Sequence, residues 1–108
     1  MATKKLYEAR AEVAKALSHP LRLEIADLLQ KEEFCVCELE EELEDASQSV
    51  ISRHLSVLKQ AGLIESRKDG LNNYYSLRVP CVERFFSCLD QVLEKDLKEK
   101  QKDLVQEG

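Results

Sequence analysis

The sequence lacks the patterns that would assign it to a membrane, secreted or enzymatic class. Apolar residues make up 44% of its 108 residues, yet no apolar run is long enough to span a bilayer. The chain does not open on a charged segment followed by an apolar one, as secretory signals do, so we expect a cytoplasmic protein. No Ser/His/Asp or Cys/His grouping and no phosphate-binding loop is evident, which argues against an enzyme that uses a reactive cysteine.

No internal repeat and no linker divides the chain, and its length fits one domain spanning residues 1–108. Four cysteines without a secretion signal argue against a disulfide scaffold. They favour metal or thiol chemistry instead.

Acidic residues are scarce in one part of an acidic chain. The net charge is −5, but residues 31–46 carry one base and eight acids, whereas residues 47–78 carry five bases and two acids. The distribution of charge matters more than its sum when a protein docks on phosphates. The segment 47–78 is therefore a candidate nucleic-acid-binding surface.

Apolar residues recur at helical spacing in the first half of the sequence. They predict helices over about 4–17, from Pro20 to about Lys31, and over 36–44. We expect Ser18 to cap the second helix and Pro20 to occupy its first turn, where a missing N–H costs nothing. His19, at the same helix start, has a structural role in this interpretation.

A fourth predicted helix, 48–61, has a polar face without any acid. Ser47 is its expected N-cap, and Gly62 ends it as a left-handed C-cap would. Its apolar face includes Ile51, Leu55 and Leu58 and also His54, which we interpret as a partly buried packing residue. Its opposite face is small, polar and basic, in a chain that is 34% charged.

The pattern changes to alternation in residues 63–79, LIESRKDGLNNYYSLRV, with Asp69-Gly70 and Asn72-Asn73 in the middle. This predicts two short strands joined by a turn. From Pro80 to about Leu104 a long last helix follows, with an apolar stripe wider than a lone terminal helix needs. The stripe either covers the core of its own chain or, as its length favours, pairs with a second chain.

This order predicts a mainly α fold with a small β-hairpin, a winged helix-turn-helix of about five helices. Residues 36–61 would be the helix-turn-helix and 63–79 the wing, with helix 48–61 in the major groove. Serine and glutamine can bind base edges or phosphates, and arginine and lysine bind phosphates. The expected DNA contacts on the helix are Ser47, Gln48, Ser49, Ser52, Arg53, Ser56 and Lys59. In the wing they are Arg67, Lys68, Asn73 and Tyr74, although turn chemistry explains Asn72 and Asn73 equally well.

Several motifs resemble one family when taken together and in order. The segments ALSHPLRLEIADLLQ, CVCEL, SQSVISRHLSVLKQAGLIESRKDG and YYSLR resemble the ArsR/SmtB family of metal-responsive repressors over about residues 11–78. The resemblance implies a homodimer paired through its terminal helices, 4–17 and 80–104, that leaves operator DNA when a metal or metalloid binds. Its SRHL motif also implies that His54 lies near the DNA backbone.

The CVC motif of Cys35 and Cys37 resembles the arsenic/antimony and cadmium/lead sensing branches of that family. This resemblance implies As(III) or Sb(III) as the inducer. Thiolates suit soft ions in general, so Cd(II), Pb(II) or Zn(II) are other possibilities. Residues i and i+2 of a helix point about 200° apart, whereas in extended backbone they share a side. Both thiols can therefore bind one ion only if the first turn of helix 36–44 is distorted.

The third ligand is not evident. The arsenic-sensor pattern has a third cysteine where this chain has Glu40, a hard ligand that is poorly suited to As(III), and residues 1–34 contain no cysteine. Cys81 and Cys88 are further candidates, although core packing is the simpler interpretation of both. A thiol-redox switch using Cys35 and Cys37, or Cys81 and Cys88, is the alternative to metal sensing.

Overall fold

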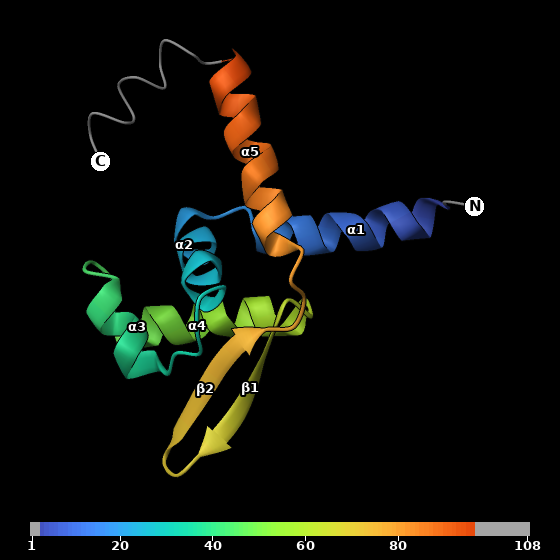
Figure 1. Ribbon diagram of the computed structural model, residues 1–108. Coiled ribbons are helices and arrows are strands. Elements are labelled where there is room, and N and C mark those ends of the chain that lie inside the picture. Colours follow the sequence, from blue (N-terminus) through green and yellow to red (C-terminus); the bar gives the residue numbers. More distant parts are fainter. Residues whose placement is uncertain (1–2, 97–108) are drawn as a thin grey trace.

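The fold is a winged helix-turn-helix, as the sequence predicts. The structure, a computed structural model, describes residues 3–96. Its elements are α1 (Lys4–Ala16), α2 (Pro20–Leu29), α3 (Val36–Glu42), α4 (Gln48–Gln60), β1 (Ile64–Asp69), β2 (Asn72–Leu77) and α5 (Val82–Asp96) (Figure 1). The part of the last helix that was predicted beyond Asp96, with Leu97 and Leu104, lies outside the described residues.

One small core joins the helix-turn-helix to the wing. Its largest fully buried side chains come from α2, α3, α4 and β1, and they are Ile25, Leu39, Ile51, Leu55, Leu58 and Ile64. These residues recur three, four or seven apart within α4, which is why its apolar face was recognisable in the sequence. α3 packs directly on α4, the helix predicted to read DNA.

The helix ends agree with the predicted caps except at α2. Its N-cap is His19, whose Nδ1 accepts a hydrogen bond from the Leu21 N–H at 3.1 Å. Ser18 instead donates its hydroxyl to the Lys15 carbonyl at 2.8 Å, so the predicted Ser18 cap is wrong and the structural role of His19 is confirmed. Ser47 caps α4 as predicted, by accepting from the Val50 N–H at 3.3 Å.

The wing is an antiparallel pair in which Ile64 lies opposite Leu77 and Asp69 opposite Asn72. The turn is Gly70-Leu71, with Gly70 at φ +67°. A two-residue hairpin loop that begins with a left-handed glycine matches the twist of the strands. Asn72 and Asn73 therefore belong to β2 rather than to the turn.

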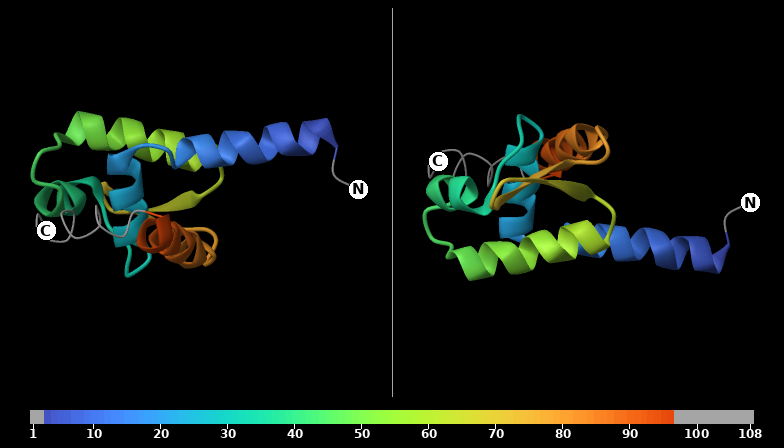
Figure 2. Two further views of the ribbon diagram at one scale, coloured as in Figure 1. Left: turned by 90° about the horizontal axis from the view of Figure 1, so that it is seen from above. Right: turned by 90° about the horizontal axis from the view of Figure 1, so that it is seen from below.

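The terminal helices leave the body on a different side from the wing. Figure 1 shows α5 and the hairpin pointing in opposite directions from the helical core, and both views of Figure 2 show α1 running out beyond it. Several of their apolar side chains are exposed, including Tyr7 at 60% and Val92 at 50%. Within residues 3–96, no helix is both long and apolar enough to cross a membrane.

Candidate nucleic-acid interface and thiol site

The polar face of α4 is exposed along its whole length. Its apolar residues are buried or half-buried, whereas the predicted DNA contacts on the opposite face are exposed, namely Gln48, Ser49, Ser52, Arg53, Ser56 and Lys59. Among these residues no acid interrupts the face, so the helix presents hydroxyl, amide and cationic groups together. This is the composition that contacts to phosphates and base edges require.

Two of the predicted DNA contacts, Ser47 and Lys59, also form hydrogen bonds within the chain. The Ser47 hydroxyl caps α4 and lies 3.3 Å from the Ser49 hydroxyl. Lys59 donates to the Ser66 hydroxyl at 2.7 Å, which ties α4 to β1. Both side chains nevertheless remain exposed, so they are accessible to DNA. The DNA contacts predicted for them stay predictions.

His54 lies half-buried on the apolar face of α4, with its ring centroid 4.5 Å from that of His19. Burial lowers the pKa of His54 below its ordinary value, and the nearby charges of His19, Arg22 and Arg53 lower it further. The packing role predicted for His54 agrees with this position. Its predicted place near the DNA backbone stays a prediction.

The wing residues differ in what surrounds them. Lys68 and Asn73 lie opposite each other near the tip and are exposed. Arg67 is instead paired with Glu33, from the loop between α2 and α3, through three hydrogen bonds of 2.8 to 3.1 Å. Its guanidinium carbon also lies 5.1 Å from the ring centroid of Tyr74. The hydrogen bonds from Arg67 lower the pKa of Glu33, and those to Glu33 raise the pKa of Arg67.

The two thiols of the CVC motif lie at the very start of α3. Cys35 is the N-cap, in extended backbone at φ −90° and ψ 171°, and only 5% of its surface is exposed. Cys37 lies in the first turn and is exposed. The Cys35 N–H donates to Glu38 Oε1 at 3.0 Å, which fixes this turn. The boundary between extended and helical backbone thus falls between the two thiols, and one of them faces the interior.

Gln48, the first residue of α4, connects the thiol segment with the DNA-reading face. Its Nε2 lies 3.6 Å from the Sγ of Cys37 and 3.0 Å from Glu40 Oε1. A residue predicted to contact DNA therefore touches a residue predicted to sense a metal, and both face solvent.

The other proposed ligands do not complete a cluster with the CVC pair. In the part of the chain that the structure describes, no three His, Cys, Asp or Glu residues lie close enough together to hold a metal ion. Cys81 and Cys88 are both exposed, so the interpretation of these residues as core packing is wrong. The reason is that α5 begins at Val82, after Cys81, and that much of its apolar stripe is not covered by its own chain.

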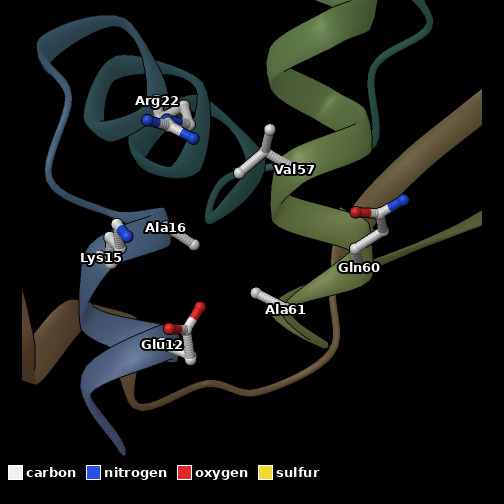
Figure 3. A pocket seen from close by; sticks show the side chains of 7 residues that line it. All are labelled: Glu12, Lys15, Ala16, Arg22, Val57, Gln60 and Ala61. Atoms are coloured by element: carbon white, nitrogen blue, oxygen red, sulfur yellow. The ribbon is translucent and has the colours of Figure 1, made fainter. Parts of the chain in front are cut away.

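One hollow of the described part of the chain lies away from the thiols. A pocket of about 400 Å³ opens between α1, α2 and α4 and is lined by Glu12, Lys15, Ala16, Arg22, Val57, Gln60 and Ala61 (Figure 3). None of the four cysteines lines this pocket, and its walls combine one acid with two bases. It is therefore a separate feature from the predicted sensor.

Sequence reasoning missed Glu33. Its partner Arg67 is 34 residues away, and no local pattern marks one acid among the eight of residues 31–46 as special. It also missed Leu71, the fully exposed apolar residue at the wing tip.

Comparison with known proteins agrees with this geometry. Residues 19–66 match the family described as bacterial regulatory protein, arsR family. An uncharacterized HTH-type transcriptional regulator of Methanocaldococcus jannaschii is 38% identical over 80% of this chain and 97% of its own. An arsenical resistance operon repressor of Staphylococcus xylosus is 34% identical over 83% and 86%, and a cadmium resistance regulatory protein CadC homolog of Staphylococcus aureus is 44% identical over 62% and 55%.

Solved structures of similar fold are also similar to this chain in sequence. The crystal structure of a Mycobacterium tuberculosis HTH-type regulator matches with a TM-score of 0.78 and 32% identity over 91% of this chain and 98% of its own. The solution structure of a homodimeric winged helix-turn-helix DNA-binding domain from Mycobacterium bovis matches at 0.75, with 31% identity over 92% and 93%. Reduced HlyU from Vibrio cholerae matches at 0.71, with 31% identity over 82% and 93%. The named relatives are transcriptional regulators and repressors, and the chain belongs to the arsR family of transcriptional repressors.

Proposed function

We propose that this chain represses transcription as a homodimer on operator DNA and releases the DNA when a thiophilic ion binds Cys35 and Cys37. Arsenite or antimonite is the expected inducer, with Cd(II), Pb(II) or Zn(II) as other soft ions that thiolates accept. The observation that carries the proposal is the contact of Gln48 Nε2 with Cys37 Sγ and Glu40 Oε1. It joins the first residue of the DNA-reading helix to the thiol segment.

The DNA side of the proposal is supported by the exposed, acid-free face of α4 and by the position of the wing beside it. We assign base-edge or phosphate contacts to Ser47, Gln48, Ser49, Ser52 and Ser56, and phosphate contacts to Arg53, His54 and Lys59. In the wing we assign contacts to Lys68, Asn73 and Tyr74, and to Arg67 once it leaves Glu33.

The thiol side is supported by the chemistry of the donors. Two sulfur atoms suit a soft ion, but Cys35 must turn out of the interior before both can face one ligand. That movement unwinds the first turn of α3, and α3 packs on α4. An ion bound to Cys37 also competes with Gln48 for the same sulfur atom. Both changes alter the contacts that hold the start of α4 in place.

Supporting this ligand assignment, relatives of the chain are named for arsenical and for cadmium resistance. The third donor remains open, since the described residues supply no cluster of three. Glu40, Cys81 and Cys88 stay candidates for it, from the same protomer or from its partner.

The test is a DNA-release titration. The chain is bound to a duplex that it has selected from a random-sequence pool, and arsenite is added while fluorescence anisotropy is recorded. We expect arsenite to release the wild type from DNA. We expect the Cys35→Ser and Cys37→Ser variants to bind DNA but not to be released by arsenite. Cys81→Ser and Cys88→Ser, changes of the two other exposed thiols, show whether either candidate third donor is also required for release. A double Cys35→Ser, Cys37→Ser variant that still responds normally would refute the sensing site.

A thiol-redox switch is the second candidate. It is favoured by the similarity to a regulator that has been solved in a reduced form, and by the exposed thiols Cys37, Cys81 and Cys88. DNA release by hydrogen peroxide in the presence of a metal chelator, reversed by dithiothreitol, would support it. Release by arsenite alone under reducing conditions would favour the metalloid.

A further inference from the structure

The guanidinium group of Arg67 is engaged on several sides by its own chain. Its Nε lies 2.9 Å from Oε2 and 3.1 Å from Oε1 of Glu33, and its Nη2 lies 2.8 Å from the same Oε1. Its Nη1 lies 3.6 Å from Oδ2 of Asp69, and its plane lies over the Tyr74 ring. The planar guanidinium of Arg67, which could bind a phosphate, therefore binds the Glu33 carboxylate instead.

The loop backbone holds Glu33 in place for this contact. The next residue, Phe34, forms an isolated antiparallel bridge with Tyr75 of β2. The Phe34 N–H donates to the Tyr75 carbonyl at 3.2 Å, and the Tyr75 N–H donates to the Phe34 carbonyl at 2.9 Å. Glu33 is thus presented to the wing from a segment that is itself bonded to the wing.

Carboxylate and phosphate compete for one arginine because both accept two parallel N–H bonds from the same planar fork. We propose that Glu33 is an internal substitute for a DNA phosphate, which holds Arg67 in the free protein and must give it up before the wing can contact the backbone fully. We call this contact the Glu33 latch. The inference deepens the proposed function and rests on it, since it assumes that the wing meets DNA.

The latch gives different roles to Arg67 and Lys68, two neighbouring basic residues of β1. Lys68 has no carboxylate within ion-pair distance among residues 3–96, so it is available to a phosphate at once. Arg67 becomes available only when the latch opens. Because Cys35 lies two residues after Glu33, the loop that carries the predicted sensor also carries the latch, and movement of this loop acts on the wing.

The experiment measures DNA affinity as a function of salt for the full chain and its Glu33→Gln variant. The probe is a labelled duplex that the wild type has selected from a random-sequence pool. The variant is expected to bind several-fold more tightly, and its plot of log affinity against log salt to be steeper by about 0.9 for each freed arginine. Arg67→Ala in the Glu33→Gln background should abolish both gains.

Glu32→Gln is the matched control, because it removes the same charge from the neighbouring exposed position without touching Arg67. An equal gain in this control, or a gain that survives Arg67→Ala, would attribute the effect to charge alone and overturn the latch. Weaker binding by Glu33→Gln would overturn it too, since Glu33 would then position Arg67 for DNA. If the wild type bound no duplex, the proposed function would fall and the latch with it, whereas unchanged affinity in Glu33→Gln defeats the latch only.

Discussion

His54 lies half-buried on the apolar face of α4, and its environment disfavours its charged form. Burial lowers its pKa from the ordinary value of 6.5, as do the charges of His19, Arg22 and Arg53. In the pH window just below 6.5 the unfolded chain therefore binds more protons than the folded one. The folded state is therefore favoured most above pH 6.5, where His54 is neutral in both states. This part of the stability is lost as the pH falls through the lowered pKa of His54.

We therefore expect the free energy of unfolding to decrease as the pH is lowered from about 7.5 to about 5.5, and His54→Gln to decrease less over the same range. Urea unfolding followed by circular dichroism measures the difference between the two proteins, which cancels the contributions of other titrating groups. An equal or larger decrease in His54→Gln would show that this side chain does not carry the effect.

At the same scale, the sequence could predict which residues face outward but not which of them meet. The exposed faces of α4 and the wing follow from spacing alone, and so does the half-buried place of His54. The Glu33–Arg67 pair joins residues 34 apart, and the contact of Gln48 with Cys37 joins residues 11 apart. Such pairs depend on how the elements pack, and a run of acids looks like a solvated face until its partner is known.

Among the elements, α3 and α4 are linked by the buried residues between them and by Gln48 at the surface. If Gln48 reports the state of Cys37, then Gln48→Ala should reduce the factor by which arsenite weakens DNA binding. Arsenite binding to the thiols should remain, because Gln48 donates to the sulfur but is not a ligand. The coupling is the ratio of DNA affinities with and without arsenite, so any loss of a direct DNA contact cancels.

Gln60→Ala is the matched control, since it truncates the same side chain at the other exposed end of α4, away from the thiols. Thiolate-to-arsenic absorption monitors ligand binding in each variant. A Gln48→Ala protein whose arsenite response equals that of the wild type and of Gln60→Ala would show that the coupling runs through the buried α3–α4 contact instead.

Element types were predictable because each has its own period. Apolar residues three and four apart predict α4, and alternation around Asp69-Gly70 predicts the hairpin. Ends were harder where two polar residues compete. Ser18 and His19 both precede Pro20. The imidazole of His19 caps α2, whereas the hydroxyl of Ser18 donates to the Lys15 carbonyl of α1.

At the scale of the whole molecule, the elements predicted to face DNA and the terminal helices lie at different sides of the core (Figure 1). The large apolar residues left exposed on α1 and α5 are Leu6, Tyr7, Val13, Phe85 and Val92. Burying such side chains against a second copy is favourable, and the M. bovis structure of the same fold is described as homodimeric. This arrangement would leave both reading helices free for one duplex.

A charge in the α5 stripe should therefore dissociate the dimer, because a buried unpaired carboxylate is costly. We expect Val92→Glu to change the mass measured by light scattering from that of two chains to that of one. DNA affinity should then fall about 100-fold, as the second binding module is lost.

Gln91→Glu places the same charge one residue away, at an exposed polar position of α5, and should leave both properties near those of the wild type. Val92 is half exposed in the single chain, so its replacement costs the fold itself little. A Val92→Glu protein that remains dimeric would place the interface on another surface, and the argument from the uncovered stripe of α5 would fail.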